Sequence, residues 1–331
     1  MAANLTPQYL KAEEQYRRAT TTEDELKALE VMLREMPKHK ASEKLQSDLK
    51  QKISRAKKEI EAQKKTGAKG HSVRIPRQGA GTAVLLGGPN AGKSQVLASL
   101  TRATPLVADY PFSTHAPLPG MMAFEDVMVQ LIDTPPITSE FMEPYLQGLV
   151  RAADVAVLLL DLASDEGPEQ CQQVLQRLAA TKTRLARTSS LDEEDVGLSF
   201  TQTLLVANKI DQPDAALRLE LFHELCAVDF SEYVISATEG TGLPELASAI
   251  YRSLDVIRVY CKQPGKPADT GAPSILPRGS SVVDMARSVH REFPDKLKYA
   301  CVWGSAKFDG QQVQRDHILQ DRDIVELHVV S

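Results

Sequence analysis

Short apolar runs alternate with segments of helical periodicity through the middle of this 331-residue chain. The runs that this pattern predicts as strands are Ala83–Leu86, Val127–Ile132, Val155–Leu160, Leu204–Ala207 and Tyr233–Ile235. Parallel strands that are buried on both faces have continuous apolar runs of this kind, and the helical segments between them supply the crossovers. We therefore expect residues 78–255 to form an α/β domain around a largely parallel sheet.

The N-terminal segment, residues 1–77, follows a helical pattern instead. It carries two apolar stripes at helical spacing, from Leu26 to Met36 and from Leu45 to Ile60, and Pro37 separates them. The two stripes predict a helical hairpin, and the segment from Lys65 to Gly81 is predicted to be a linker.

Residues 256–331 predict a third, smaller α+β domain. Strands are expected at Ile257–Cys261, Ala300–Trp303 and Ile324–Val330, and a helix at Val282–Phe293, where Pro294 would end it. The stretch from Lys182 to Phe200, by contrast, has no clear periodicity and is expected to be a mobile surface loop.

Composition and termini favour a cytoplasmic protein. Hydrophobic residues make up 42% of the chain and charged residues 25%, as in soluble globular proteins. The first residues have neither the basic nor the apolar region of a signal peptide, and no apolar run is long enough to cross a bilayer. The four cysteines lack the spacing of a metal site or disulfide framework, so we expect reduced thiols and no membrane partner.

The net charge of −5 is unevenly distributed along the chain. Residues 1–77 hold 18 Lys and Arg against 11 Asp and Glu, and the excess is sharpest at 38–77, with 13 against 4. Such a block forms either a solvated helix face or an electrostatic footprint for RNA, and the sequence leaves both interpretations open. No feature indicates a DNA partner.

The sequence GGPNAGKS at Gly87–Ser94 matches the phosphate-binding pattern G-x-x-x-x-G-K-[ST]. It follows a predicted strand and precedes a helical segment from Gln95, which is the context that the pattern requires. Glycines allow backbone N–H groups to surround phosphate oxygens, and the N-terminus of the following helix favours negative charge. Lys93 would contact the β- and γ-phosphates and Ser94 would bind Mg²⁺. Alone, this motif leaves ATPases and nucleotide kinases open.

A second motif, NKID at Asn208–Asp211, indicates that the base is guanine. It follows another predicted strand, 115 residues after Lys93. The Asp211 carboxylate would accept hydrogen bonds from N1–H and the exocyclic amine of guanine, whereas adenine would leave it unpaired. Sites of this kind discriminate by about 10⁴-fold or more. The tripeptide SAT at 236–238, after the next strand, fits a loop whose backbone contacts the guanine oxygen.

Two further residues complete the predicted site. Asp133 ends a predicted strand, where a carboxylate near magnesium is expected, and Thr114 would close a switch loop on magnesium and the γ-phosphate. The nucleotide contacts that we predict are Gly87, Gly88, Pro89, Asn90, Ala91, Gly92, Lys93, Ser94, Gln95, Asn208, Lys209, Asp211, Ser236, Ala237 and Thr238. The predicted metal ligands are Ser94, Thr114 and Asp133.

With these motifs, the chain resembles the Obg-like GTPases, especially the developmentally regulated GTP-binding proteins, over nearly its whole length. The lysine-rich segment 38–44, the sequence YPFST at Tyr110–Thr114 and residues 257–329 carry the resemblance, and the last looks like a TGS domain, a ubiquitin-like β-grasp module. The resemblance implies a Ras-like GTPase domain that binds GTP or GDP with Mg²⁺, slow hydrolysis, and association with ribosomes or translation factors.

The third motif departs from this family. The family has D-x-P-G, whereas this chain has Pro136 after Asp133-Thr-Pro. The missing glycine would give its backbone N–H to the γ-phosphate, and proline has no such donor. Either a neighbouring amide substitutes, or γ-phosphate sensing is weakened and switching or hydrolysis is blunted. The sequence leaves both open.

Two positions bear on hydrolysis. Ile137 stands where many GTPases have a water-orienting glutamine, as is usual in Obg-like members. Asn90 corresponds to the asparagine that binds potassium in cation-stimulated relatives, although its side chain could also only stabilise the loop. We assign candidate catalytic roles to Lys93, Thr114 and Asn90. Only about 75 residues separate Asp133 from Asn208, so the inserted domain of eukaryotic-type members is expected to be absent.

The function that we predict is a GTP- and GDP-binding regulatory protein with slow, magnesium-dependent and potassium-stimulated hydrolysis. It would contact ribosomes or RNA through residues 38–77 and the TGS domain. The alternative is a nucleotide-binding scaffold, or an RNA-binding adaptor, that hydrolyses little because Pro136 replaces the glycine. A ligand with equal affinity for two states shifts neither, so such a scaffold would not act as a switch.

Overall fold

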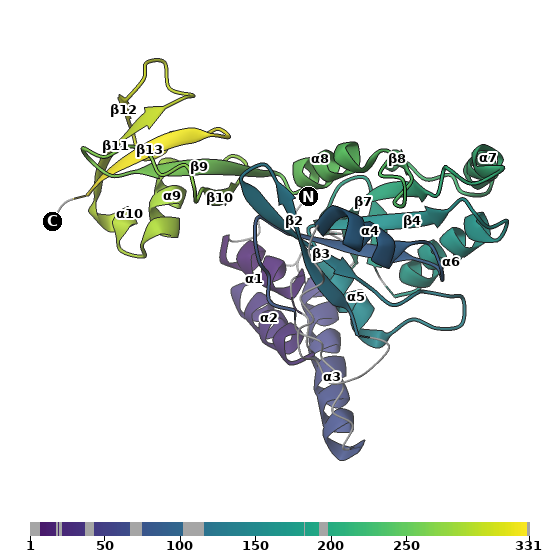
Figure 1. Cartoon of the computed structure of the whole chain (residues 1–331). Helices are drawn as coiled ribbons and strands as arrows, with labels where there is room; N and C mark the ends of the chain where they lie inside the picture. The colour runs from purple at the N-terminus through teal and green to yellow at the C-terminus, as the bar shows by residue number, and fades with distance from the viewer. Residues whose placement is uncertain are drawn as a thin grey trace. The chain divides into compact units, whose positions relative to one another are not determined.

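The computed structural model describes residues 7–17, 19, 22–36, 43–66, 75–101, 116–181, 183–191 and 198–329. These residues form two compact units. The first comprises the described residues up to Met122 together with Gln130–Ile250, and the second comprises Ala123–Val129 with the described residues from Tyr251 onward (Figure 1).

Three helices open the first unit: α1 (Pro7–Arg17), α2 (Thr22–Glu35) and α3 (Glu43–Thr66). The predicted hairpin corresponds to α2 and α3, whose stripes meet at Leu29, Met32 and Leu49 in one cluster. The structure adds α1, which buries Tyr9, Ala12 and Tyr16 in the same cluster. The spacing of these three residues, i, i+3 and i+7, places them on one helix face.

The sheet of the first unit follows the predicted strands and extends them. Its strands are β1 (Thr82–Gly87), β2 (Leu118–Phe124), β3 (Val127–Asp133), β4 (Val155–Asp161), β5 (Thr183–Ala186), β6 (Ser190–Leu191), β7 (Ser199–Asn208) and β8 (Ser231–Ile235). Their order is β2-β3-β1-β4-β7-β5, and β6 and β8 also pair with β7. The pairs β1–β3, β1–β4, β4–β7 and β7–β8 are parallel, as the apolar runs predict.

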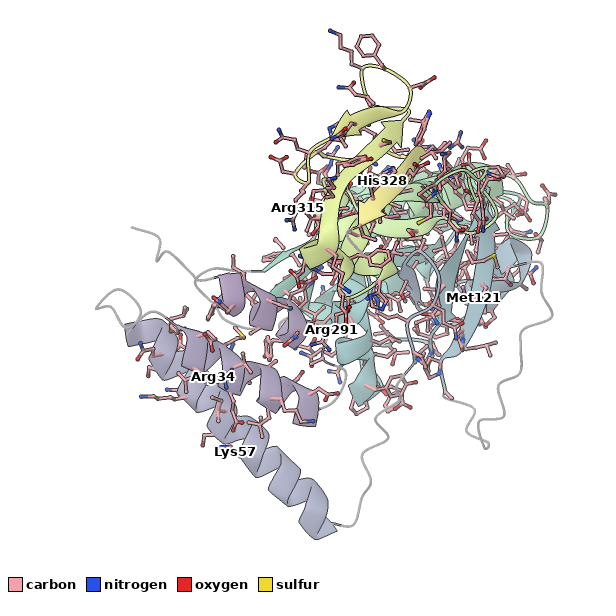
Figure 2. The ribbon with its side chains drawn as sticks, turned by 90° about the vertical axis from the view of Figure 1, so that its left-hand side faces the viewer. Arg34, Lys57, Met121, Arg291, Arg315 and His328 are labelled. Carbon is pink, nitrogen blue, oxygen red and sulfur yellow. The ribbon has the colours of Figure 1, made fainter. Side chains whose placement is uncertain are left out.

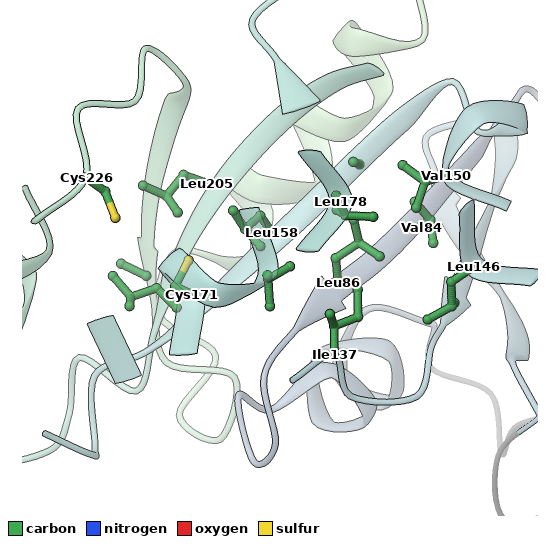
Figure 3. Close-up of a cluster of buried hydrophobic side chains, with 14 of the residues drawn as sticks. Val84, Leu86, Ile137, Leu146, Val150, Leu158, Cys171, Leu178, Leu205 and Cys226 are labelled. Carbon is green, nitrogen blue, oxygen red and sulfur yellow. The ribbon is translucent and has the colours of Figure 1, made fainter. Parts of the chain in front are cut away.

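Helices connect these strands and cover the sheet. They are α4 (Lys93–Thr101), α5 (Pro144–Ala152), α6 (Gly167–Ala179), α7 (Ala215–Leu225) and α8 (Leu243–Ser253). Apolar residues of α5, α6 and α7 form one core with strand residues such as Val84, Leu158 and Leu205 (Figure 3). Neighbouring strand residues, such as Leu85 and Leu159, point to the opposite face and are also buried.

The prediction of a mobile loop at 182–200 is wrong for its described part. Residues 183–186 form β5 parallel to the start of β7, and residues 190–191 form β6 antiparallel to it. The first half of β7 escaped notice because its buried side chains are the hydroxyls Ser199, Thr201 and Thr203 rather than apolar groups. Hydrophobic periodicity does not reveal a strand whose inward positions are polar.

The second unit contains a five-stranded sheet. Its strands are β9 (Val256–Lys262), β10 (Ser274–Pro277), β11 (Leu297–Trp303), β12 (Gln311–Val313) and β13 (Asp323–Val329), in the order β10-β9-β13-β11-β12. The single long helix that the sequence predicts is instead two, α9 (Val282–Val289) and α10 (Phe293–Lys296). Ser281 caps α9 through a capping box with Asp284, and Pro294 lies inside the first turn of α10, where proline is tolerated.

A buried arginine organises one end of the second unit. The Arg258 guanidinium is 4% exposed and donates to Asp321, at 2.6 Å from Nη2, and to Asp126, at 2.7 Å from Nη1. It also donates to Glu125, to which Arg322 donates at 2.6 Å. Glu125 has a φ of 51° and Arg322 one of 70°, which side chains rarely adopt. The ion pairs therefore hold two unfavourable backbone conformations in place.

We expect Arg258→Met to lower the free energy of unfolding of this unit by about 2–3 kcal/mol, because it leaves Asp126 and Asp321 close together without their shared cation. Urea unfolding followed by tryptophan fluorescence measures this unit, since Trp303 is the single tryptophan of the chain. Arg287→Met, which removes an exposed pair with Asp284, is the matched control and should cost less than about 1 kcal/mol. Equal losses in the two variants would contradict the assigned role.

The same cluster makes this unit sensitive to acid. Hydrogen bonds from Arg258 hold the pKa of Asp321 and of Glu125 below their usual ranges. A carboxylate whose pKa is lowered by folding stabilises the fold above its unfolded pKa, and this contribution is lost as pH falls through its folded pKa. The wild type should therefore lose more stability than Arg258→Met when the pH is lowered from about 5 to about 3.

Candidate nucleotide-binding site

The carboxyl ends of neighbouring parallel strands bring the sequence motifs to one edge of the sheet. Gly87–Ser94 follows β1, Asp133 ends β3, Asn208 ends β7 and Ser236 follows β8. Ligands of open α/β sheets bind at this edge, because the loops and helix N-termini that follow the strands converge there. Contacts between the motifs, described below, confirm that they are adjacent.

Asn208 joins the phosphate loop to the loop after β8. Its side-chain amide donates to the carbonyl of Ala91 at 3.0 Å, and its side-chain oxygen accepts from the backbone N–H of Ala237 at 3.1 Å. The side chain is buried, so both bonds form without competition from water. Gly92 makes room for it: a Cβ there would lie 2.3 Å from Nδ2, and φ is +92°.

Lys93 is the first residue of α4 and its ammonium lies within the phosphate loop. Nζ donates to the carbonyls of Gly87 at 3.2 Å and Gly88 at 2.8 Å. Burial lowers the pKa of Lys93 to about 8, and the charge of Asp133 opposes this shift. A cation that is desolvated in this way gains strongly from a phosphate placed in the loop.

The other residues of the phosphate loop differ in accessibility. Asn90 is exposed at the tip of the loop with a φ of 57°, Pro89 is half-buried and Ala91 is buried. Gln95 is exposed, and its amide donates to Ser99. The loop is also packed from behind, because a Cβ on Gly88 would come within 2.8 Å of the side-chain oxygen of Gln170 on α6.

Two of the predicted magnesium ligands, Ser94 and Asp133, have side chains that lie together. The Ser94 hydroxyl donates to Oδ2 of Asp133 at 2.5 Å. Oδ1 of Asp133 is buried and has no hydrogen-bond partner among the described residues. Burial raises the pKa of this carboxyl, against the effects of Ser94 and Lys93.

A desolvated carboxylate oxygen beside a hydroxyl fits Mg²⁺, which prefers oxygen ligands and retains several waters. Ser94 would ligate the ion and Asp133 would bind its water shell, and the ion would supply positive charge between the phosphates. The predicted third ligand, Thr114, lies outside the described residues.

The base-reading motif continues beyond Asn208. Oδ1 of Asp211 has no hydrogen-bond partner among the described residues, while Oδ2 accepts from Gln212. Lys209, which has a φ of 71°, forms an ion pair with Asp161 at 2.8 Å. Asp161 is 5% exposed and ends β4, between the strands that carry the two motifs. The position of Asp161, a carboxylate at the end of an apolar run, is the feature of the sequence that could have identified it, and no motif assigned it a role.

The loop after β8 is held by hydroxyl groups. Ser236 Oγ lies 3.1 Å from Oγ1 of Thr238 and accepts from the backbone N–H of Glu239. The carbonyl of Ala237 accepts from Ser99 of α4 at 2.8 Å. This bond spans 138 residues of sequence, and no motif indicated Ser99. The two loops that would surround the base and the phosphates are thus connected through α4 as well as through Asn208.

The third motif is fixed to β1. The Thr134 hydroxyl donates to the carbonyl of Leu85 at 2.6 Å, and the backbone N–H of Ile137 donates to the carbonyl of Gly87 at 3.2 Å. The Ile137 side chain is 1% exposed and belongs to the main core, beside Leu86 (Figure 3). The position that carries a water-orienting glutamine in many GTPases therefore serves packing here.

Comparison with known proteins identifies two domains in the chain. Residues 82–192 match the family described as 50S ribosome-binding GTPase, and residues 257–329 match the TGS domain. An uncharacterised GTP-binding protein of Methanocaldococcus jannaschii is 27% identical, over 92% of each chain. The developmentally-regulated GTP-binding protein 2 homolog of Dictyostelium discoideum is 26% identical, over 92% of this chain and 98% of its own.

Among solved structures, the YchF GTPase of Schizosaccharomyces pombe aligns with a TM-score of 0.51 at 11% identity, over 76% of this chain and 99% of its own, which supports the fold alone. In the described part of the chain, no helix is both long and apolar enough to span a membrane. The chain thus joins a GTPase domain of the 50S ribosome-binding GTPase family to a C-terminal TGS domain, and its relatives include developmentally regulated GTP-binding proteins.

Proposed function

We propose that this protein is a cytoplasmic regulator that binds GTP and GDP with Mg²⁺, hydrolyses GTP slowly and acts in contact with ribosomes or RNA. The observation that carries the nucleotide assignment is the pairing of Asn208 with both loops, because it aligns the phosphate loop with the unpaired Asp211 oxygen. One bound molecule with a diphosphate and a guanine would engage both.

Slow hydrolysis follows from the groups that line the phosphate end. Lys93 would stabilise charge that develops on the phosphates, and Thr114 would close over them. With Ile137 in the core, position 137 cannot orient the attacking water, so the remaining acceleration would come from positioning and charge. A potassium ion held by Asn90 near the phosphates would add positive charge.

A second candidate function is a nucleotide-binding scaffold with little hydrolysis. It is favoured by the anchored third motif, in which Pro135 and Pro136 have no N–H and the Ile137 N–H is already bonded to Gly87. The two candidates agree on guanine nucleotide binding and differ in turnover.

The role of Asp211 is tested by Asp211→Asn. The asparagine side chain presents an N–H₂ group where guanine also presents its amine, so GDP affinity should fall by about 100-fold or more. Xanthosine diphosphate, which has an oxygen in place of that amine, should bind better to the variant than to the wild type. Titration calorimetry with both nucleotides measures this exchange of preference. A parallel loss of both nucleotides would contradict a base-reading role.

Hydrolysis is tested by phosphate release from GTP in potassium and separately in sodium, with magnesium present. We expect release in potassium to be at least about tenfold faster, and Asn90→Ala to remove the difference while GDP binding persists. Gln173→Ala, which removes a surface hydrogen bond to Glu169 on α6 and changes no predicted contact, is the matched control and should keep the stimulation. No release above background in either salt, with GDP still bound, would support the scaffold instead.

RNA contact is proposed for helix α3, the described part of the basic block. Lys50 and Arg55 are exposed on α3, whereas Leu49 and Ala56 form its buried seam. Lys57, labelled in Figure 2, is instead paired with Glu30 of α2 at 3.0 Å. Binding to ribosomal RNA should weaken as salt rises, because contact with phosphates releases counterions.

Replacing Lys50 and Arg55 together by alanine should reduce the slope of log affinity against log salt by about 1–1.5. The control is Arg34→Ala on α2, which is exposed and paired with Glu35, and it should leave the slope unchanged. Affinity that does not depend on salt would exclude this electrostatic contact.

A further inference from the structure

The third motif of a GTPase distinguishes GTP from GDP through backbone N–H groups that meet the γ-phosphate. In this chain, the residues at and beside the family's glycine position are Pro135, Pro136 and Ile137. Neither proline has an N–H. The Ile137 N–H donates to the Gly87 carbonyl at 3.2 Å. Residues 135–137 thus have no free N–H group to offer to a third phosphate.

The Ile137 amide is also not free to change partner. Its side chain is 1% exposed and packs in the core with Leu86 and Leu146 (Figure 3). Turning the Ile137 N–H away from Gly87 would move a fully buried isoleucine, which is unfavourable, and would leave the Gly87 carbonyl with Lys93 Nζ as its remaining donor. A neighbouring amide therefore does not substitute for the missing glycine.

Thr134, at the start of this segment, is also held in place. The Thr134 side chain is buried, and its hydroxyl donates to the Leu85 carbonyl at 2.6 Å. Residues 134 and 137 are thus both bonded to the end of β1, and Pro136, which is exposed, lies between these two attachment points. A proline restricts φ to about −65°, so the short bridge has little freedom to rearrange.

Resting on the proposed guanine nucleotide binding, we propose that Pro136 removes γ-phosphate recognition from the third motif, so that this part of the site binds GDP and GTP alike. Discrimination between the nucleotides is left to other groups, such as Lys93 and the switch loop that contains Thr114. Helix α5, which follows the motif, then keeps one position in both nucleotide states.

The test compares the ratio of the affinities for a non-hydrolysable GTP analogue and for GDP in the wild type and three variants. Pro136→Ala restores the N–H group, and Pro136→Gly restores it together with backbone freedom. Pro135→Ala adds an N–H at the neighbouring position, where the family motif also has proline, and is the matched control. We expect Pro135→Ala to keep the wild-type ratio within about threefold. The two Pro136 variants should shift the ratio towards the analogue by about tenfold relative to the wild type, the gain of one hydrogen bond to a charged oxygen.

Hydrogen exchange at the Ile137 amide gives a second readout. In the wild type, this amide should be equally protected with GDP and with the analogue, because its bond to Gly87 persists. Unaltered ratios in both Pro136 variants, an equal shift in Pro135→Ala, or loss of Ile137 protection with the analogue would each overturn the proposal. Failure of every variant and the wild type to bind either nucleotide would instead refute the proposed function.

Discussion

The nucleotide site depends on one buried side chain, Asn208. Its amide group fixes two loops that are far apart in sequence, because each of its polar atoms has one partner and water does not compete. Gly92 is required where this side chain passes the phosphate loop, and Lys209 and Asp211 take their positions from the strand that Asn208 ends. The distance between the base-reading and phosphate-binding parts of the site is therefore set by the two hydrogen bonds of Asn208, together with the bond from Ser99 of α4 to Ala237.

Two ionisable groups of this site, Lys93 and Asp133, are already at least partly buried in the protein without a ligand. Burial lowers the pKa of Lys93 and raises that of Asp133, so each group bears its charge at a cost that the other only partly offsets. A phosphate beside Lys93 and a divalent cation beside Asp133 would supply the missing counter-charges. The electrostatic cost of burying Lys93 and Asp133 would therefore be offset when phosphate and cation bind, rather than within the free protein.

In the third motif, by contrast, the Thr134 hydroxyl and the Ile137 N–H already have hydrogen-bond partners within the protein. Thr134 and Ile137 are bonded to β1, and the end of α5 is held in a similar way: Thr201 donates to the carbonyl of Val150, and Arg77 donates to that of Ala152. Such a segment contributes stability but has little reason to respond to a ligand, since a ligand shifts an equilibrium only by its differential affinity. Under the proposal made above, binding of nucleotide and response to its third phosphate would be separate properties of this chain.

The sequence by itself determined the five central strands, the phosphate and base-reading motifs and the order of the parts, because these depend on local periodicity and on short patterns with a known mechanism. It left open whether an amide replaces the missing glycine, and it did not reveal α1, β5, β6 or the break between α9 and α10. Tertiary structure decided the rest. Asp161, Ser99 and the partners of Arg258 act across 48 to 138 residues of sequence, and the fate of the Ile137 amide depends on a core that only the folded chain assembles. Contacts of this kind leave no periodic trace, because each depends on two segments that meet only after folding.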